Sequence, residues 1–160
     1  MTPRYENELK HEREQLGDLL RQREELETKI AKQLTRVAAL SSLSDEGRVG
    51  KMMETELGGL TNACRVAFRA AGDKGLIPTE VRSALERLQF PTRSHKNILS
   101  SIHTVIRRLL EAGEIRKAIH DIHDGRDESV YQWALPSYGA SNSLANQFAD
   151  TDRDHARREG

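Results

Sequence analysis

The chain has 160 residues, of which 36% are apolar and 4% aromatic, and its formal net charge is zero. This length allows one compact domain with an extension or two small domains, and so few apolar residues predict that the whole chain does not share one core. The balanced charge argues against indiscriminate nucleic-acid binding. No segment resembles a membrane span or a signal peptide, so we expect a cytoplasmic protein that does not contact membranes.

Residues 4–41 are predicted to form one long helix and a coiled coil, with self-association through residues 5–40. The segment holds no proline and a single glycine, Gly17. A heptad frame places apolar residues at eight of its eleven a and d positions. The number and direction of the helices stay open, and the alternative is a single charged helix that folds back on the domain. The a and d positions are Tyr5, Leu9, Glu12, Leu16, Leu19, Arg23, Leu26, Ile30, Gln33, Val37 and Leu40.

Two segments outside this helix are predicted to lack a core of their own. Residues 42–59 are polar and small, which indicates a linker with a short helical turn over 49–54, and Gly58-Gly59 marks its end. Residues 136–160 are rich in Ser, Asn, Asp and Arg, which predicts a disordered tail.

Residues 60–135 are predicted to form a packed domain of three helices and a two-strand hairpin. The fold class is therefore mainly α with a small β-hairpin wing (α+β), preceded by the long N-terminal helix. The predicted elements in chain order are a helix over 61–71 with Thr61 as N-cap, an extended piece over 75–77, a helix from Pro78 to Gln89, a helix over 97–112 stopped by Gly113, a strand over 114–119, a turn over 120–128 and a strand over 129–135.

The helix over 97–112 is the most informative of these elements, because its two faces differ in chemistry. Leu99, Ile102, Ile106 and Leu109 form one apolar stripe at helical spacing. Residues 93–117 carry six basic side chains against two acidic ones, Glu111 and Glu114. Hydroxyl, imidazole and guanidinium groups on one helix face suit phosphates and base edges. The opposite face carries Lys96, Ser100, His103 and Arg107, with Thr104 and Arg108 on its flank.

The order of elements and two local patterns resemble the prokaryotic winged helix-turn-helix regulators, and more loosely the HARE-type helix-turn-helix. Residues 76–85 are similar to the strand and Thr-Pro-x-Glu-Ile opening of that family's second helix. Residues 102–115 are similar to its recognition helix, which runs into the wing. The resemblance covers residues 60–135. Two features depart from the family: Ile77 stands where a Thr or Ser N-cap is usual, and the connection over 89–96 is longer than a tight turn.

The resemblance implies a sequence-specific protein that binds double-stranded DNA, a transcriptional regulator whose helix 97–112 reads the major groove. The alternative is a non-catalytic protein–protein interaction or scaffold module, because winged helices also bind proteins. An acidic wing with Asp121, Asp124, Asp127 and Glu128 favours this alternative. A separate alternative for the polar face of the helix is a solvated surface on which Arg107 pairs with Glu111, four residues further on. The candidates for reading bases are Ser100, His103, Thr104 and Arg107, and those for binding phosphates are Arg93, Lys96, Arg108 and Arg126.

Catalysis, cofactors and metals are not expected. Cys64 has no evident His partner, and its apolar helical surroundings predict a core residue. Potential metal ligands occur in the run His120-Asp121-Ile122-His123-Asp124. The sequence offers no second group of such ligands, and the run fits a polar hairpin tip equally well. There is no glycine-rich phosphate loop, because Gly58-Gly59 lacks the lysine and the spacing that one needs.

Overall fold

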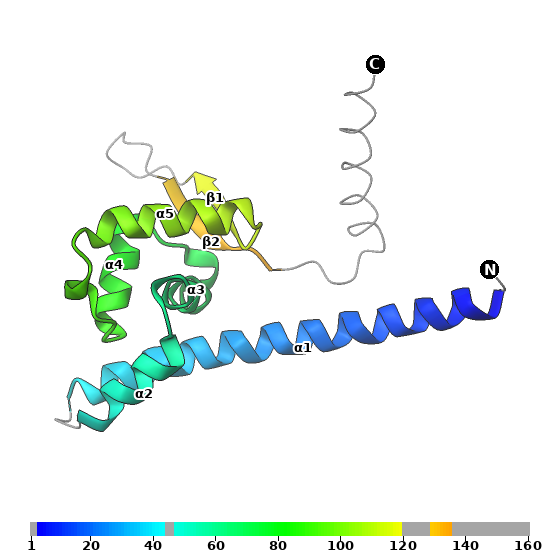
Figure 1. Cartoon of the computed structure of the whole chain (residues 1–160), viewed down its shortest axis with the longest axis horizontal. Coiled ribbons are helices and arrows are strands. Elements are labelled where there is room, and N and C mark those ends of the chain that lie inside the picture. Colours follow the sequence, from blue (N-terminus) through cyan, green and yellow to red (C-terminus); the bar gives the residue numbers. More distant parts are fainter. Residues whose placement is uncertain (1–2, 44–46, 120–128, 136–160) are drawn as a thin grey trace, which may run out of the picture. The chain divides into compact units, whose positions relative to one another are not determined.

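The computed structural model of the chain describes residues 3–43, 47–119 and 129–135. Described residues from Glu24 to Leu135 form one compact unit, and residues 3–23 belong to a second unit. The predicted fold class is confirmed: the structure is mainly helical, with a long N-terminal helix and a small antiparallel hairpin (Figure 1). The predicted turn over 120–128 and the predicted tail over 136–160 lie outside the described residues. The elements are α1 (Pro3–Ser41), α2 (Gly47–Leu57), α3 (Leu60–Ala71), α4 (Pro78–Arg87), α5 (Ile98–Glu111), β1 (Ile115–Ile119) and β2 (Ser129–Trp133), with short 3-10 turns at Gly72–Lys74 and Thr92–Ser94.

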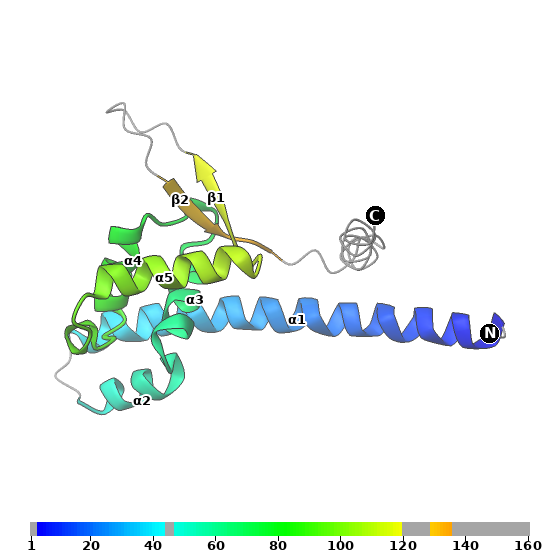
Figure 2. The same ribbon diagram turned by 45° about the horizontal axis from the view of Figure 1, so that its top comes forward.

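Helix α3 lies at the centre of the unit formed by residues 24–135, with α4, α5 and the hairpin packed around it (Figures 1 and 2). Its buried side chains include Cys64 and Phe68, neither of which is exposed to solvent. Small residues at Ala63 and Ala67 on the same face let the neighbouring helices approach closely. The prediction that Cys64 is a core residue is confirmed.

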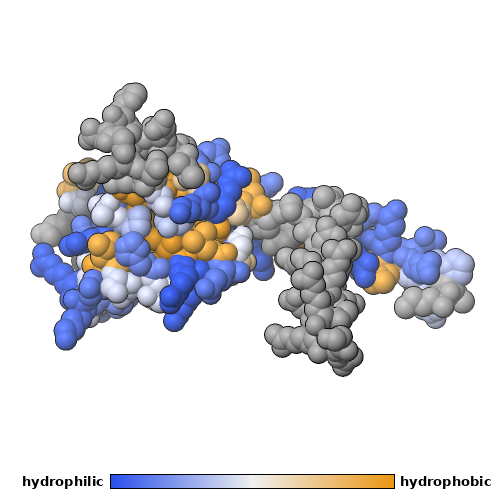
Figure 3. All heavy atoms as spheres, turned by 90° about the horizontal axis from the view of Figure 1, so that it is seen from above, coloured by the Kyte–Doolittle hydropathy of each residue, from blue (hydrophilic) through white to orange (hydrophobic). Residues whose placement is uncertain are grey.

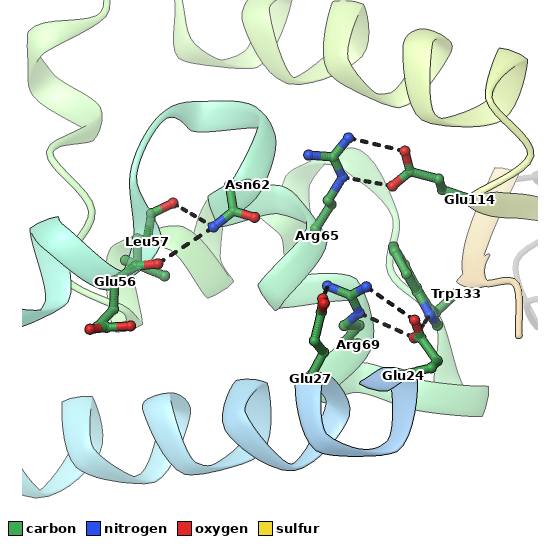
Figure 4. Close-up of polar contacts among 9 residues, drawn as sticks. All are labelled: Glu24, Glu27, Glu56, Leu57, Asn62, Arg65, Arg69, Glu114 and Trp133. Atoms are coloured by element: carbon green, nitrogen blue, oxygen red, sulfur yellow. Dashed lines mark hydrogen bonds and ion pairs between the residues drawn. The ribbon is translucent and has the colours of Figure 1, made fainter. Parts of the chain in front are cut away.

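The segment predicted as a linker over 42–59 contains an eleven-residue helix, α2. The predicted short turn over 49–54 therefore lies within a longer helix. Met53 and Leu57, spaced by four residues, are fully buried in the core. The side-chain amide of Asn62 donates hydrogen bonds of 2.9 Å to the Leu57 carbonyl and 3.5 Å to the Glu56 carbonyl, which satisfies acceptors at the end of α2 (Figure 4).

The helix boundaries confirm some predicted caps and correct one. Helix α3 begins at Leu60, so its N-cap is Gly59, two residues before the predicted N-cap Thr61. Pro78 takes the first position of α4, as predicted, and the Ile77 N–H donates to the Glu80 carboxylate at 3.0 Å. This is the half of a capping box that the N3 residue supplies, whereas the half that a Thr or Ser N-cap side chain would supply is missing at Ile77.

The hairpin pairs β1 with β2 in antiparallel register, with Ile115 opposite Trp133 and Ile119 opposite Ser129. The predicted extended piece over 75–77 is present, since Leu76 forms an isolated antiparallel bridge with Tyr131. Gly75 precedes this bridge with φ +68°, and a Cβ atom there would lie 2.7 Å from a methyl carbon of Val130 and 2.8 Å from the Tyr131 carbonyl oxygen. Glycine therefore allows the chain to pass against β2.

Helix α1 is continuous from Pro3 to Ser41, and residues 24–41 of it belong to the same compact unit as the core. Its buried residues lie on a stripe about 100° around the helix from the predicted a and d positions. The stripe holds Ala31 and Ala38, which pack closely because they are small, together with Leu34. The alternative of a helix that packs on the domain is therefore realised for this part of α1. The a and d residues Leu26 and Ile30 are 57% and 52% exposed, whereas Val37, at an a position near the end of α1, is half-buried and packs against the core. The predicted coiled-coil face is therefore used in this packing only at Val37.

A buried polar cluster joins α1 to α3 and β2 (Figure 4). The guanidinium of Arg69 donates two hydrogen bonds of 3.2 Å to the Glu24 carboxylate and forms a 2.7 Å ion pair with Glu27. It also lies over the Trp133 ring, 4.3 Å from the ring centroid. The Trp133 indole N–H donates to the Glu24 carboxylate at 2.7 Å. Glu24 is only 8% exposed, so these contacts compensate for the removal of its charge from water.

Candidate nucleic-acid interface

Helix α5 is set in place by caps at both ends and by one buried face. The Asn97 side chain accepts a 3.1 Å hydrogen bond from the Ser100 N–H, and Gly113 follows the helix with φ +72°. The predicted stripe is correct for Ile102, Ile106 and Leu109, whereas Leu99 is only half-buried. Ile98 and Val105 complete the buried face.

The face of α5 that points away from the core carries Ser100, His103 and Arg107, all exposed. They follow one another at intervals of three and four residues, so they form a row along one side of the helix. From Ser100 to Arg107 this row extends about 10 Å, which is the length of three base pairs of DNA. The structure therefore brings together three of the four residues predicted to read bases.

Thr104, the fourth predicted base-reading residue, lies on the flank of this row. It is half-buried, and its hydroxyl donates a 3.2 Å hydrogen bond to the Ser100 carbonyl. A hydroxyl that is already bonded to its own helix has only acceptor capacity left for a ligand. Thr104 is thus less suited to base contacts than the three residues of the exposed row.

The basic side chains around α5 are exposed and lack acidic partners within the part of the chain that the structure describes. Arg93, Lys96, Arg107 and Arg108 are all exposed, and none of them forms an ion pair with a described residue. The proposed alternative, a pair between Arg107 and Glu111, is absent among the described residues. Elsewhere in the same unit, by contrast, Arg65, Arg69 and Arg82 each pair with a glutamate. Arg126, the fourth predicted phosphate ligand, lies outside the described residues.

A surface pocket of about 470 Å³ lies beside the row, between α5 and the start of α3. Helix α3 begins with Gly59 as its N-cap and no side-chain cap, so the N–H groups of its first turn have no acceptor within the helix. An unfilled helix N-terminus carries a partial positive charge that favours anions. The lining residues are Gly59, Leu60, Thr61, Asn62, Arg65, Ser101, Thr104, Val105 and Arg108.

Two arginines line this pocket, and they differ in their electrostatic state. The Arg65 guanidinium donates hydrogen bonds of 2.6 Å and 3.0 Å to both carboxylate oxygens of Glu114 (Figure 4). This contact raises the pKa of Arg65 and leaves its charge largely compensated. Arg108 forms no ion pair with any residue that the structure describes, so it is the group in the pocket with charge available for an anion.

Of the residues that line this pocket, Thr104 and Arg108 are predicted from the sequence as DNA ligands, whereas Thr61, Arg65 and Ser101 are not. The only sequence signal for them is Gly58-Gly59, which precedes Leu60 and Thr61 at a helix start. Seen from the side on which α5 and the hairpin lie, the surface mixes hydrophilic and hydrophobic side chains (Figure 3).

Other candidate chemistry has little support among the described residues. Burial raises the pKa of the Cys64 thiol to about 12, so the thiol stays protonated and unreactive in the folded protein. No group of three or more potential metal ligands occurs in the described ranges, and the sequence 120–124 lies outside them. No described helix is both long and apolar enough to span a bilayer. Comparison of the chain with protein-family models, curated proteins and solved structures found no significant match.

Proposed function

We propose that residues 60–135 form a winged helix-turn-helix domain that binds double-stranded DNA, and that the protein is a transcriptional regulator. The observation that carries the proposal is the exposed row of Ser100, His103 and Arg107 on α5, flanked by cationic side chains without ion-pair partners among the described residues. The order of α3, α4, α5 and the hairpin supports it, because in a winged helix the third helix of the domain enters the major groove.

In this proposal Arg107 makes the largest contribution to discrimination between DNA sequences. Its guanidinium can donate two hydrogen bonds to the O6 and N7 atoms of one guanine, which no other base offers in that arrangement. His103 and Ser100, one and two turns before it, contact the next base edges along the groove. All three project from a helix whose opposite face is fixed in the core, so the backbone that carries them is held in place before DNA binds.

In this proposal, cationic side chains on either side of the α5 row contact the DNA phosphates. Arg93 and Lys96 precede α5, and Arg108 lies beside the start of α3 in the surface pocket. A phosphate in this pocket would receive the Arg108 charge and the N–H groups of the first turn of α3. These contacts fix orientation and affinity without sequence information.

The test is binding of the full chain to DNA, measured by fluorescence anisotropy over a salt series. Selection from a random duplex pool should enrich one sequence, and affinity for random DNA should fall linearly with salt on a logarithmic scale. Arg107→Ala should weaken binding to the selected site about 5- to 150-fold and remove the preference at one base pair. Lys96→Ala should weaken binding to all DNA and lower the salt slope by about one.

Arg82→Ala is the matched control, because Arg82 is an exposed arginine on α4 that pairs with Glu86 at 3.3 Å. It removes the same charge as Arg107→Ala, but from a different helix and from an arginine that already has an acidic partner. Equal losses for Arg82→Ala and Arg107→Ala would contradict specific readout by α5. Absence of any affinity for DNA at low salt would overturn the proposal and favour the scaffold alternative.

A further inference from the structure

Between residues 5 and 30, one face of α1 carries large apolar side chains that are exposed and do not belong to the buried core. In the part of α1 within residues 3–23, Tyr5, Leu16 and Leu19 are 64%, 56% and 61% exposed. In the part within residues 24–41, Leu26 and Ile30 are 57% and 52% exposed. Five large side chains in one heptad frame, on one continuous helix, are far more apolar surface than a solvent-facing helix normally carries.

We infer that this face pairs with the same face of a second copy of the chain as an antiparallel two-stranded coiled coil over residues 5–30. We call the row of a and d residues that would meet in the dimer the seam. The relative direction of the two helices follows from its two charged residues, Glu12 at a d position and Arg23 at an a position. In an antiparallel pair, each a residue packs against a d residue of the partner helix. The favoured direction and register are therefore those that place Glu12 of one copy opposite Arg23 of the other.

One antiparallel register satisfies the whole seam between residues 5 and 30. When Leu16 packs against Leu19 of the second copy, Leu9 packs against Leu26 and Tyr5 against Ile30. The same register places Glu12 opposite Arg23, and the symmetry of the pair repeats this contact. At the flanking g positions, Glu8 then faces Lys29 of the second copy, which is also attractive.

The parallel in-register arrangement fits less well. It places Arg23 opposite Arg23 and Glu12 opposite Glu12, so two layers of the seam hold like charges. Like charges in direct opposition within an interface strongly disfavour an arrangement. Shifting the antiparallel register by one heptad instead places Glu12 and Arg23 against apolar residues. Only the first register pairs both charges and keeps every other layer apolar.

The size of the interface is adequate for a stable dimer. Six apolar residues per copy lie in the overlap, and all are at least 45% exposed. Covering them on both copies would bury on the order of 1,000 Å² or more, which is where specific interfaces begin. The Glu24 and Ala31 stripe that packs on the core lies on a different side of α1, so dimerisation leaves the domain packing in place.

Charge exchange on the full chain tests both the pairing and its direction. Sedimentation equilibrium should show a dimer, and Glu12→Arg or Arg23→Glu alone should raise the dissociation constant at least about tenfold. The double variant restores opposite charges in both layers and should return the constant to within about twofold. In a parallel pair each single variant would keep like charges in opposition, and the double variant would restore nothing. Glu14→Arg, at an exposed f position, is the control and should have no comparable effect.

Distances between spin labels provide a second test of direction. Cysteines introduced at Asp18 or Asn7 can be labelled selectively, because Cys64 is fully buried. In the antiparallel register the two labels at position 18 lie at nearly the same height, whereas those at position 7 are offset along the axis by about 30 Å. A monomeric chain at tens of micromolar, unaffected dissociation constants in both single variants, or equal distances at the two positions would each overturn the inference.

Discussion

Replacing Arg69 with methionine removes the cation at the centre of the buried cluster that joins α1 to the core (Figure 4). Methionine keeps most of the volume of the side chain, so the change isolates the polar contacts. In Arg69→Met, the Glu24 carboxylate keeps only the 2.7 Å hydrogen bond from the Trp133 indole. Removing one partner of a buried ion pair leaves an uncompensated charge, which typically costs about 3–5 kcal/mol. Because Glu24 retains one donor and slight exposure, we expect the lower end, about 3 kcal/mol of unfolding free energy.

The assay is urea unfolding, followed by circular dichroism and by the fluorescence of Trp133, which is the single tryptophan of the chain and belongs to the cluster. The matched control is Arg82→Met, whose ion pair with Glu86 is about half exposed on both sides. This control should change the unfolding free energy by no more than about 0.5 kcal/mol. A cost for Arg69→Met no larger than that of Arg82→Met would refute the reasoning.

The double variant Glu24→Leu/Arg69→Met sharpens the test. It removes the Glu24 carboxylate together with the Arg69 guanidinium, so no unpaired carboxylate remains in the buried position, and Glu27, which also pairs with Arg69, is 38% exposed. The main loss is then the acceptor of the Trp133 indole. We expect it to be more stable than Arg69→Met alone, with a total cost of about 1–2 kcal/mol. Additive losses from the two single substitutions would show that the burial of an unpaired charge is not the dominant effect.

Three further predictions concern the core and the helix ends. Gly75→Ala should lower the unfolding free energy by about 2–4 kcal/mol in urea titrations, because the added Cβ meets Val130 at 2.7 Å and alanine disfavours φ +68°; a loss below about 1 kcal/mol would contradict the close approach. The thiol of Cys64, with its pKa raised by burial from an ordinary value near 9 to about 12, stays protonated in the folded chain while the unfolded thiol ionises. Its contribution to stability is therefore complete below pH 9 and falls by about 1.4 kcal/mol per pH unit between 9 and 12, so the unfolding free energy of Cys64→Ala should decline less steeply over that range. Asn97→Ala should cost about 1 kcal/mol through loss of the 3.1 Å cap on the Ser100 N–H, and a neutral result in thermal unfolding would show that solvent replaces this cap.

The elements with strong local signals were predictable from the sequence. Helix α5 has a clear period of 3.6 residues between Asn97 and Gly113, and the structure places it at Ile98–Glu111. Pro78 marks the start of α4 for a purely local reason, since its ring fixes φ and its missing N–H is not needed there. The two strands are recognisable because apolar and polar residues alternate within them.

The features that depend on distant contacts were not predictable. Helix α2 lies in a polar segment, and its buried Met53 and Leu57 gain their role only from the surfaces that pack against them. On α1, the packing stripe contains Ala31 and Ala38, and alanine gives a weak hydrophobic signal beside the large side chains of the heptad frame. The surface pocket combines residues 59–65 with residues 101–108, and no pattern in the sequence relates the two segments.

The bond between Glu24 and Trp133 spans 109 positions of the chain, so the two ends of the compact unit are held to each other. During synthesis the second half of α1 leaves the ribosome early, while its indole partner on β2 leaves more than a hundred residues later. Until then, the Glu24 carboxylate lacks the hydrogen bond from the Trp133 indole. We therefore expect the unit of residues 24–135 to complete its folding only after Trp133 has left the ribosome.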